Sequence, residues 1–235
     1  MSGQEENVTL SRQPEGQGGA AATAAAASVA GAAAPAETAA PAVDTSASKL
    51  TLEQFLERRR TSQSVYAFDL RASEAYDASH LPGAYSLPFE HLEPNLPRLP
   101  FSGDVLLYDG GEGTVRQAAA LLADNGFSDF WYLEEGYDAL MEAIRSSPAE
   151  VHYESLTAEE RAAKIDQVLN EKVREFLARD GGGLEVMAIE ESKVVVAYQG
   201  ACGSCSSSTA GTLRFIQGML TINLNHEIEV VPVET

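Results

Sequence analysis

The only two cysteines of the chain, Cys202 and Cys205, are separated by two residues in a loop of small residues. Two thiolates at this spacing can bind one metal ion or one edge of an iron–sulfur cluster, and two thiols can also form a redox-active disulfide. Gly200 and Gly203 let the backbone turn tightly and leave room for a bulky inorganic group. The serines at 206–208 supply N-cap oxygens for a helix, and the positive end of that helix favours thiolates nearby.

The residues alone leave three interpretations of this pair open. The pair is a dithiol–disulfide oxidoreductase or persulfide acceptor, or half of a zinc or iron–sulfur site completed by a second chain, or two unrelated structural cysteines. The third interpretation is the weakest, because structural cysteines rarely lie in a loop with nothing apolar beside them. The low cysteine count also excludes a disulfide-stapled scaffold and a four-cysteine metal site within one chain.

Composition limits the function classes further. The chain has 235 residues, enough for one large or two small domains, and its 35 acidic against 16 basic residues give a net charge of −19. Such a surface repels nucleic acid. No apolar run is long enough for a membrane-spanning helix. Residues 1–47 are rich in alanine and predict a disordered tail, and their acidic start is unlike a secretory or transit peptide, so we expect a cytoplasmic protein.

Residues 48–148 predict an α/β domain. Thr51 and Gln54 form a capping-box pattern at the start of an amphipathic helix. Apolar runs follow, and they alternate with helical patterns near 114–122 and 137–144, which is typical of a parallel sheet with crossover helices. The runs are 65–68, 105–108 and 130–133.

Residues 155–235 predict a separate small α+β domain. Thr157 and Glu160 form a second capping box, before a long helix that glycines at 181–183 end. Two strand patterns around the turn at 190–192 indicate a β-hairpin. The cysteine loop, a helix over about 209–220 and a strand at 228–231 complete the order α-β-β-α-β.

The stretch from Asp180 through the sequence Gly200-Ala201-Cys202-Gly203-Ser204-Cys205 resembles the NifU C-terminal domain family of iron–sulfur scaffold and carrier proteins. The resemblance covers roughly residues 157–233. It implies a [4Fe–4S] cluster shared by two subunits, with Cys202 and Cys205 of each as ligands, and therefore a homodimer that passes the cluster to client apoproteins. Members usually carry proline where this chain has Ser206, which affects the helix start more than the ligand set.

Residues 50–145 resemble the rhodanese homology domain, through Phe68-Asp69-Leu70-Arg71 and the turn His80-Leu81-Pro82-Gly83-Ala84. The resemblance implies a parallel sheet with helices on both faces. Active members place a nucleophilic cysteine directly after the second of the strands above, where this chain has Asp109, and an arginine at the end of the following loop, where it has Thr114. A carboxylate cannot form a persulfide, so we expect no sulfurtransferase activity and no catalytic residue here.

Asp109 has other roles open to it. We expect it to cap the helix that begins near Thr114, inside a cradle of loop N–H groups. A sharper hypothesis is that Asp109 and Glu112 bind iron weakly. We expect His80 to make structural hydrogen bonds, and the run at 58–60 to be an exposed helix end, with a docking patch as the alternative.

Together these features predict a non-enzymatic cluster scaffold or carrier. The rhodanese-like domain is then expected to bind an assembly partner, either a cysteine desulfurase or a client apoprotein. An oxidoreductase that uses Cys202 and Cys205, and a zinc-binding adaptor, remain the alternatives.

Overall fold

The computed structural model describes residues 45–179, 181–200 and 206–233. The tail predicted over 1–47 therefore lies outside the described residues, except for its last three, of which residues 46 and 47 belong to the short helix η1 (Ser46–Ser48). Cys202 and Cys205 also lie outside them. Within the described ranges, no helix is long and apolar enough to cross a membrane.

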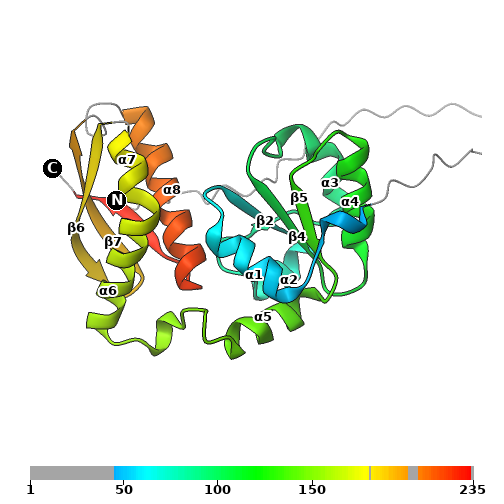
Figure 1. Cartoon of the computed structure of the whole chain (residues 1–235), viewed down its shortest axis with the longest axis horizontal. Helices are drawn as coiled ribbons and strands as arrows, with labels where there is room; N and C mark the ends of the chain where they lie inside the picture. The colour runs from blue at the N-terminus through cyan, green and yellow to red at the C-terminus, as the bar shows by residue number, and fades with distance from the viewer. Residues whose placement is uncertain (1–44, 180, 201–205, 234–235) are drawn as a thin grey trace, which may run out of the picture. The chain divides into compact units, whose positions relative to one another are not determined.

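The first sheet has five parallel strands in the order β1-β5-β4-β2-β3 (Figure 1). Its three central strands are the three apolar runs predicted from sequence, in register with Phe68 opposite Leu107 and Leu107 opposite Tyr132. The two outer strands are two residues long, too short for a recognisable pattern. The strands are β1 (Lys49–Leu50), β2 (Val65–Asp69), β3 (Tyr85–Ser86), β4 (Asp104–Tyr108) and β5 (Phe130–Leu133).

Helices cover both faces of this sheet, which confirms the α/β prediction. On one face, α1 (Leu52–Thr61) and α5 (Gly136–Ser146) pack on the sheet, and on the other face α3 (Phe89–Asn95) and α4 (Thr114–Asp124) do so (Figure 1). The Thr51 capping box that starts α1 is present in the structure. The short helices α2 (Ser73–Ala78) and η2 (Leu96–Arg98) join these elements and were not predicted.

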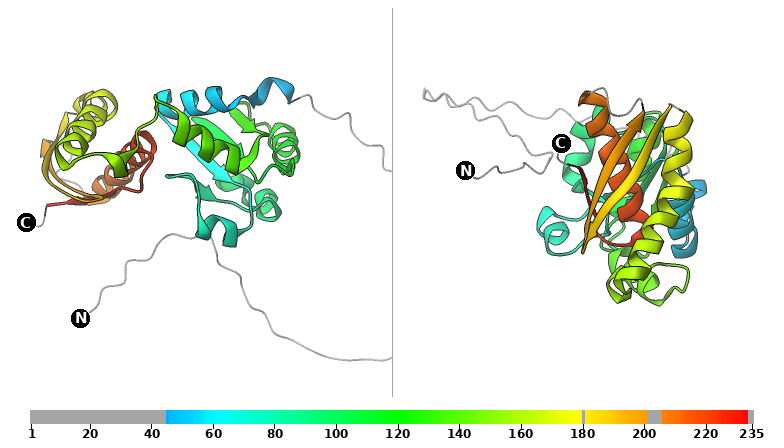
Figure 2. Two further views of the ribbon diagram at one scale, coloured as in Figure 1. Left: turned by 90° about the horizontal axis from the view of Figure 1, so that it is seen from below. Right: turned by 90° about the vertical axis from the view of Figure 1, so that its left-hand side faces the viewer.

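The second sheet has three strands, and its helices lie on one face of it (Figure 2). β6 and β7 form the predicted antiparallel hairpin, and β8 runs parallel to β7. This confirms the order α-β-β-α-β. The elements are α6 (Ala158–Val168), the π-helical turn η4 (Leu169–Arg174), α7 (Glu175–Arg179), β6 (Gly182–Glu190), β7 (Lys193–Gly200), α8 (Ser206–Leu224) and β8 (Glu229–Pro232).

One boundary of the hairpin differs from the prediction. The preceding helix ends at Arg179, just before the glycines predicted to end it. The first strand, however, begins at Gly182, because Gly182 and Gly183 pair with Gly200 and Gln199. Pairing with β7 supplies the backbone hydrogen bonds that a helix stop would otherwise leave to water. The hairpin therefore extends to the residue at which the cysteine loop begins.

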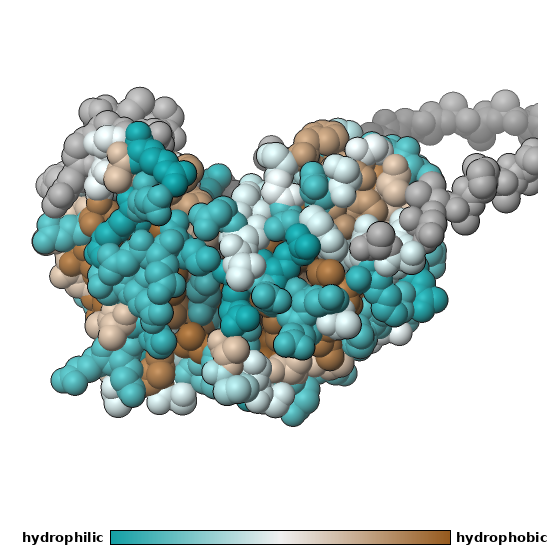
Figure 3. Space-filling view, in the orientation of Figure 1, coloured by the Kyte–Doolittle hydropathy of each residue, from teal (hydrophilic) through white to brown (hydrophobic). Residues whose placement is uncertain are grey.

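The net acidity is carried by solvated surfaces. Hydrophilic side chains cover the faces of α6 and α7 that are visible in Figure 3. Their buried sides carry Ile165, Val168 and Leu177, which pack on the second sheet. The division into one apolar and one charged side is the ordinary pattern of a helix that covers a sheet.

The arginine run at the end of α1 is not the exposed helix end that we expected. Arg59 is only 1% exposed, whereas Arg60 and Arg58 are partly exposed. Arg59 lies four residues after Phe55 and three after Leu56, so it shares their buried face of the helix.

Glu134, directly after β5, ties three elements together. Its carboxylate accepts hydrogen bonds from Arg116 Nε at 2.6 Å and Nη2 at 2.8 Å, and from Lys49 Nζ at 2.6 Å. The bonds from Arg116, followed by the bond from Lys49, lower the pKa of Glu134 to about 2.

This pairing predicts an acid dependence of stability. Because the pKa of Glu134 is lower in the folded chain, its contribution is complete above pH 4.5 and is lost as the pH falls toward 2. We expect Glu134→Gln to lower the free energy of unfolding by about 1 kcal/mol at pH 6, after screening by solvent, and by less at pH 3. Urea titrations at both pH values measure this difference. Equal losses at pH 6 and pH 3 would contradict it.

Candidate functional sites

The carboxyl ends of β2 and β4 place two buried aspartates at the same edge of the first sheet. Asp69 is the last residue of β2, and Asp109 directly follows β4; both are fully buried. In a parallel sheet this edge is where functional loops gather. A buried carboxylate needs strong partners, so the donors around each aspartate decide what it can do.

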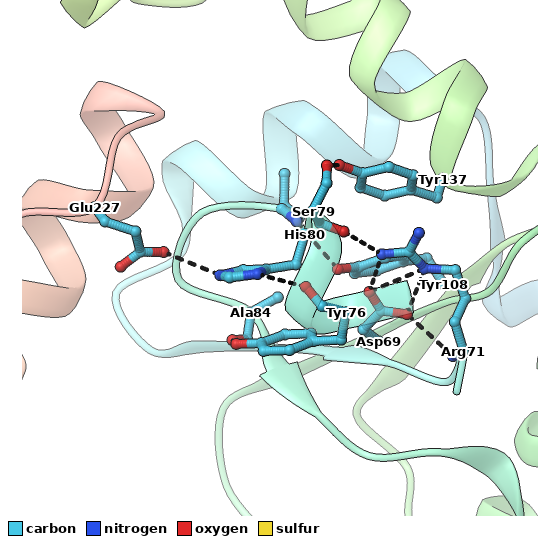
Figure 4. Close-up of polar contacts among 10 residues, drawn as sticks. Asp69, Arg71, Tyr76, Ser79, His80, Ala84, Tyr108, Tyr137 and Glu227 are labelled. Atoms are coloured by element: carbon cyan, nitrogen blue, oxygen red, sulfur yellow. Dashed lines mark hydrogen bonds and ion pairs between the residues drawn. The ribbon is translucent and has the colours of Figure 1, made fainter. Parts of the chain in front are cut away.

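Asp69 is held by Arg71. The Arg71 guanidinium donates from Nε to Oδ1 at 2.9 Å and from Nη2 to Oδ2 at 2.6 Å, and it also donates to the Ser79 carbonyl. Its Cζ lies 3.7 Å from the centre of the Tyr137 ring, and Figure 4 shows the guanidinium between Asp69 and that ring. Tyr108 lies beside this pair, and burial raises its pKa. The pair is a closed structural ion pair with its charges already matched.

The Asp109 carboxylate fills the loop that follows β4. Its Oδ1 accepts from the Gly111 N–H at 2.7 Å, and its Oδ2 accepts from the Thr114 hydroxyl at 2.8 Å and the Val115 N–H at 3.2 Å. Val115 belongs to the first turn of α4, so Asp109 satisfies one of the N–H groups that a helix start leaves free. The predicted helix cap is thus confirmed, and Thr114, in place of the family's arginine, holds the same carboxylate.

The backbone around this loop is packed tightly. Gly136 has φ +80°, and a Cβ there would lie 2.7 Å from the Gly110 carbonyl carbon and from the Gly111 nitrogen. Tyr137 N–H also donates to the Asp109 carbonyl at 2.8 Å. The start of α5 therefore presses on the loop, and only glycine at 136 permits that approach.

These contacts do not favour the iron hypothesis for Asp109 and Glu112. Both carboxylate oxygens of Asp109 are engaged by donors of the loop, and Glu112 is exposed. Among the described residues, no group of three or more His, Cys, Asp or Glu gathers as a metal site.

His80 makes the structural contacts expected of it. Its Nδ1 lies 3.0 Å from the Tyr76 carbonyl, its ring stacks on the Tyr76 ring, and its Nε2 lies 3.6 Å from Glu227 Oε1. The Tyr76 hydroxyl in turn donates to the Ala84 carbonyl, and burial raises the pKa of Tyr76 to about 12 (Figure 4). These contacts fix the turn at 80–84.

The second candidate site is the segment that carries Cys202 and Cys205. The cysteines themselves lie outside the described residues, but the elements on both sides are described. β7 ends at Gly200, where it pairs with Gly182, and α8 begins at Ser206. A central strand and a helix of 19 residues thus flank the segment.

The same segment matches known proteins. A family model described as a NifU-like domain matches residues 165–231. A nitrogen fixation protein NifU from Anabaena sp. (strain L31) is 41% identical over 76 residues, which are 32% of this chain and 68% of that protein. The chain belongs to the NifU family.

Other NifU relatives match over a smaller share of their length. The nitrogen fixation protein NifU of a Nostoc species is 43% identical over 75 residues, 32% of this chain and 25% of that protein. A protein named NifU-like protein 1, chloroplastic, from Arabidopsis thaliana is 44% identical over 68 residues, 29% of each chain. This NifU-family chain therefore spans only about a quarter of the length of several relatives.

The first sheet and its helices match a second model, described as a rhodanese-like domain, over residues 51–143. This chain has the rhodanese-like fold in that region, as the parallel sheet covered on both faces already indicated. Solved structures that it resembles include a rhodanese-like domain from an Anabaena protein, at 28% identity and TM-score 0.33, covering 36% of this chain and 97% of that one. A rhodanese-like protein from Staphylococcus aureus has 21% identity and TM-score 0.36, covering 39% and 89%.

The sequence predicted the capping role of Asp109 and the strand and helix on either side of the cysteines, but it did not predict that Arg59 is buried. The signal was available, because Arg59 lies seven residues after Leu52 and four after Phe55 on the apolar face of α1. The neighbouring arginines on both sides obscured that position.

Proposed function

We propose that this chain is an iron–sulfur cluster scaffold or carrier, in which Cys202 and Cys205 bind the cluster. The observation that carries the proposal is that this pair, the only cysteines of the chain, lies inside the segment matched by the NifU-like model. The chain is organised as a tail over 1–47, a rhodanese-like domain over 48–148 and a NifU-like domain over 155–235. It acts in the cytoplasm, whereas one relative is named as chloroplastic.

The cluster is a [4Fe–4S] cluster shared by two subunits. A cubane cluster is held by four thiolates, and each chain has two cysteines, so two chains complete one site. α8 begins directly after Cys205, and the positive end of a helix favours thiolates and the negative charge of the cluster. A cluster at a subunit boundary is open to attack by an incoming thiolate, which suits delivery to client apoproteins by ligand exchange.

The rhodanese-like domain acts by binding and not by catalysis. Asp109 occupies the position of the nucleophilic cysteine, and three donors hold its carboxylate, so no persulfide forms there. Its partner is a client apoprotein or a cysteine desulfurase of the assembly pathway.

Anaerobic reconstitution with iron and sulfide tests the function. We expect a broad absorption at about 400 nm, about two irons per chain, and a change from monomer to dimer on loading. Iron and sulfide analysis with light scattering measures these quantities. A colourless protein with about half an equivalent of zinc per chain would indicate the adaptor instead. Absent absorption together with a reducible disulfide between the two cysteines would indicate the oxidoreductase.

A further inference from the structure

The buried Arg59 joins the end of α1 to the segment that follows α8. Its Nη1 donates to the Ile222 carbonyl at 2.9 Å and to Asn225 Oδ1 at 2.7 Å, and its Nη2 donates to the Pro82 carbonyl at 2.6 Å. Ile222 is in the last turn of α8, where carbonyls lack partners within the helix. The guanidinium of Arg59 therefore binds one oxygen of the rhodanese-like region and two of the NifU-like region at the same time.

The charge of Arg59 persists despite its burial. Burial lowers its pKa to about 10, so the guanidinium remains protonated at neutral pH. Glu150, also buried, lies on the segment between α5 and α6 and accepts from Asn225 Nδ2 at 2.7 Å. Asn225 thus contacts Arg59 with one side-chain atom and Glu150 with the other. Separating Arg59 from these partners would leave a buried charge unpaired, which is costly in free energy.

Beside Arg59, the backbone of the turn at 80–84 comes close to side chains at the end of α8. Gly83 has φ +77°, and a Cβ there would lie 3.1 Å from Ile222 Cγ1 and 3.3 Å from Thr221 Cγ2. The Gly83 N–H donates to Glu227 Oε1 at 2.8 Å. The turn at 80–84 therefore packs against the end of α8 and donates a hydrogen bond to the loop that follows it.

The apolar residues around this junction form one packed cluster. It includes Phe55 and Leu140 of the rhodanese-like region and Leu220 and Ile222 of α8. Both regions also fall within one compact unit, residues 43–235. Apolar contacts alone do not determine the orientation of the two regions. The planar guanidinium does, because its N–H groups must point at particular oxygen atoms.

We propose that the rhodanese-like region is an internal platform for the NifU-like region, with Arg59 as the positioning residue that latches the end of α8 to it. The platform's occupant is the last turn of α8 and the loop to β8 of the same chain. This role needs no thiol at position 109 and does not depend on the proposed cluster binding, since it operates in the protein without cluster. Removing the guanidinium releases α8 from the platform and leaves both folds intact.

Hydrogen exchange on the full chain without cluster tests the latch. In Arg59→Met, we expect amides of the last turn of α8 and of the end of α1 to exchange at least about tenfold faster than in the unaltered chain. Strand β4 and the hairpin of β6 and β7 should keep their protection. Arg98→Met is the matched control, because Arg98 is exposed and its guanidinium donates to Asn95 within the same short segment, and it should change neither region.

Two outcomes overturn the proposal. Unchanged exchange at both contact surfaces would show that Arg59 does not hold them together. Loss of protection throughout both regions would show that Arg59 supports a single folding unit and is no latch.

A second variant serves if Arg59→Met does not fold. Glu227→Ala removes the acceptor for the Gly83 N–H and the carboxylate beside His80 Nε2, from a side chain that is 58% exposed. It should speed exchange at the same two surfaces by about twofold to threefold. No change there would overturn the platform role. A double-mutant cycle of Arg59→Met with Asn225→Ala should be non-additive, whereas additive effects would exclude their coupling.

Discussion

Replacing Cys202 or Cys205 with alanine is expected to abolish cluster binding, from about two irons per chain to less than about 0.2. In the proposed cluster each subunit supplies two cysteines, so one substitution would remove two of the four ligands of the dimer. Absorption at about 400 nm and the dimer formed on loading should disappear together.

The fold should survive these substitutions. The described core of the second sheet is built from β6, β7, β8 and the helices on one face, none of which contains the cysteines. Far-ultraviolet circular dichroism should therefore match that of the unaltered chain. Glu112→Ala is the matched control: it removes an exposed carboxylate from the rhodanese-like loop and should keep the full iron content. Retention of iron by either cysteine variant would place the iron elsewhere and contradict the proposed site.

Asp109→Ala is expected to lower the free energy of unfolding by about 2 to 4 kcal/mol. The substitution leaves the Gly111 N–H, the Val115 N–H and the Thr114 hydroxyl without the acceptor that they share. It also removes the side chain that caps α4, which adds to the loss. Asp109→Asn keeps one acceptor oxygen, so its loss should be about half as large.

Denaturation followed by fluorescence measures this effect directly. Trp131, the only tryptophan, lies in β5, next to β4, and reports on the sheet that Asp109 terminates. Glu112→Ala again serves as the control, since an exposed loop side chain should change stability by less than about 0.5 kcal/mol. A loss within that limit for Asp109→Ala would mean that water replaces the carboxylate without cost, and the structural role assigned to it would be wrong.

The central strands and main helices were predictable because their signals are local. β2, β4 and β5 are continuous apolar runs, and both capping boxes occur where Thr51 and Thr157 indicated them. The cap by Asp109 was also predictable, since aspartate before a glycine-rich helix start has few other partners.

The remaining features depend on contacts that sequence patterns do not contain. β1 and β3 are strands only because β5 and β2 provide neighbours for two residues each. The hairpin includes Gly182 because Gly200, 18 positions later, pairs with it. Arg59 is buried because oxygens near positions 82 and 222 reach it, and three adjacent arginines resemble an ordinary charged surface.

The three donors around Asp109 also bear on the direction in which this domain can evolve. A change to cysteine at that position would remove an acceptor on which the loop, its threonine and the start of α4 depend. The chain would lose stability at that first step, because the Thr114 hydroxyl and the Val115 N–H would be left without their acceptor. The loop is therefore matched to a carboxylate at position 109, and a thiol there would need compensating changes at the residues that now donate to it.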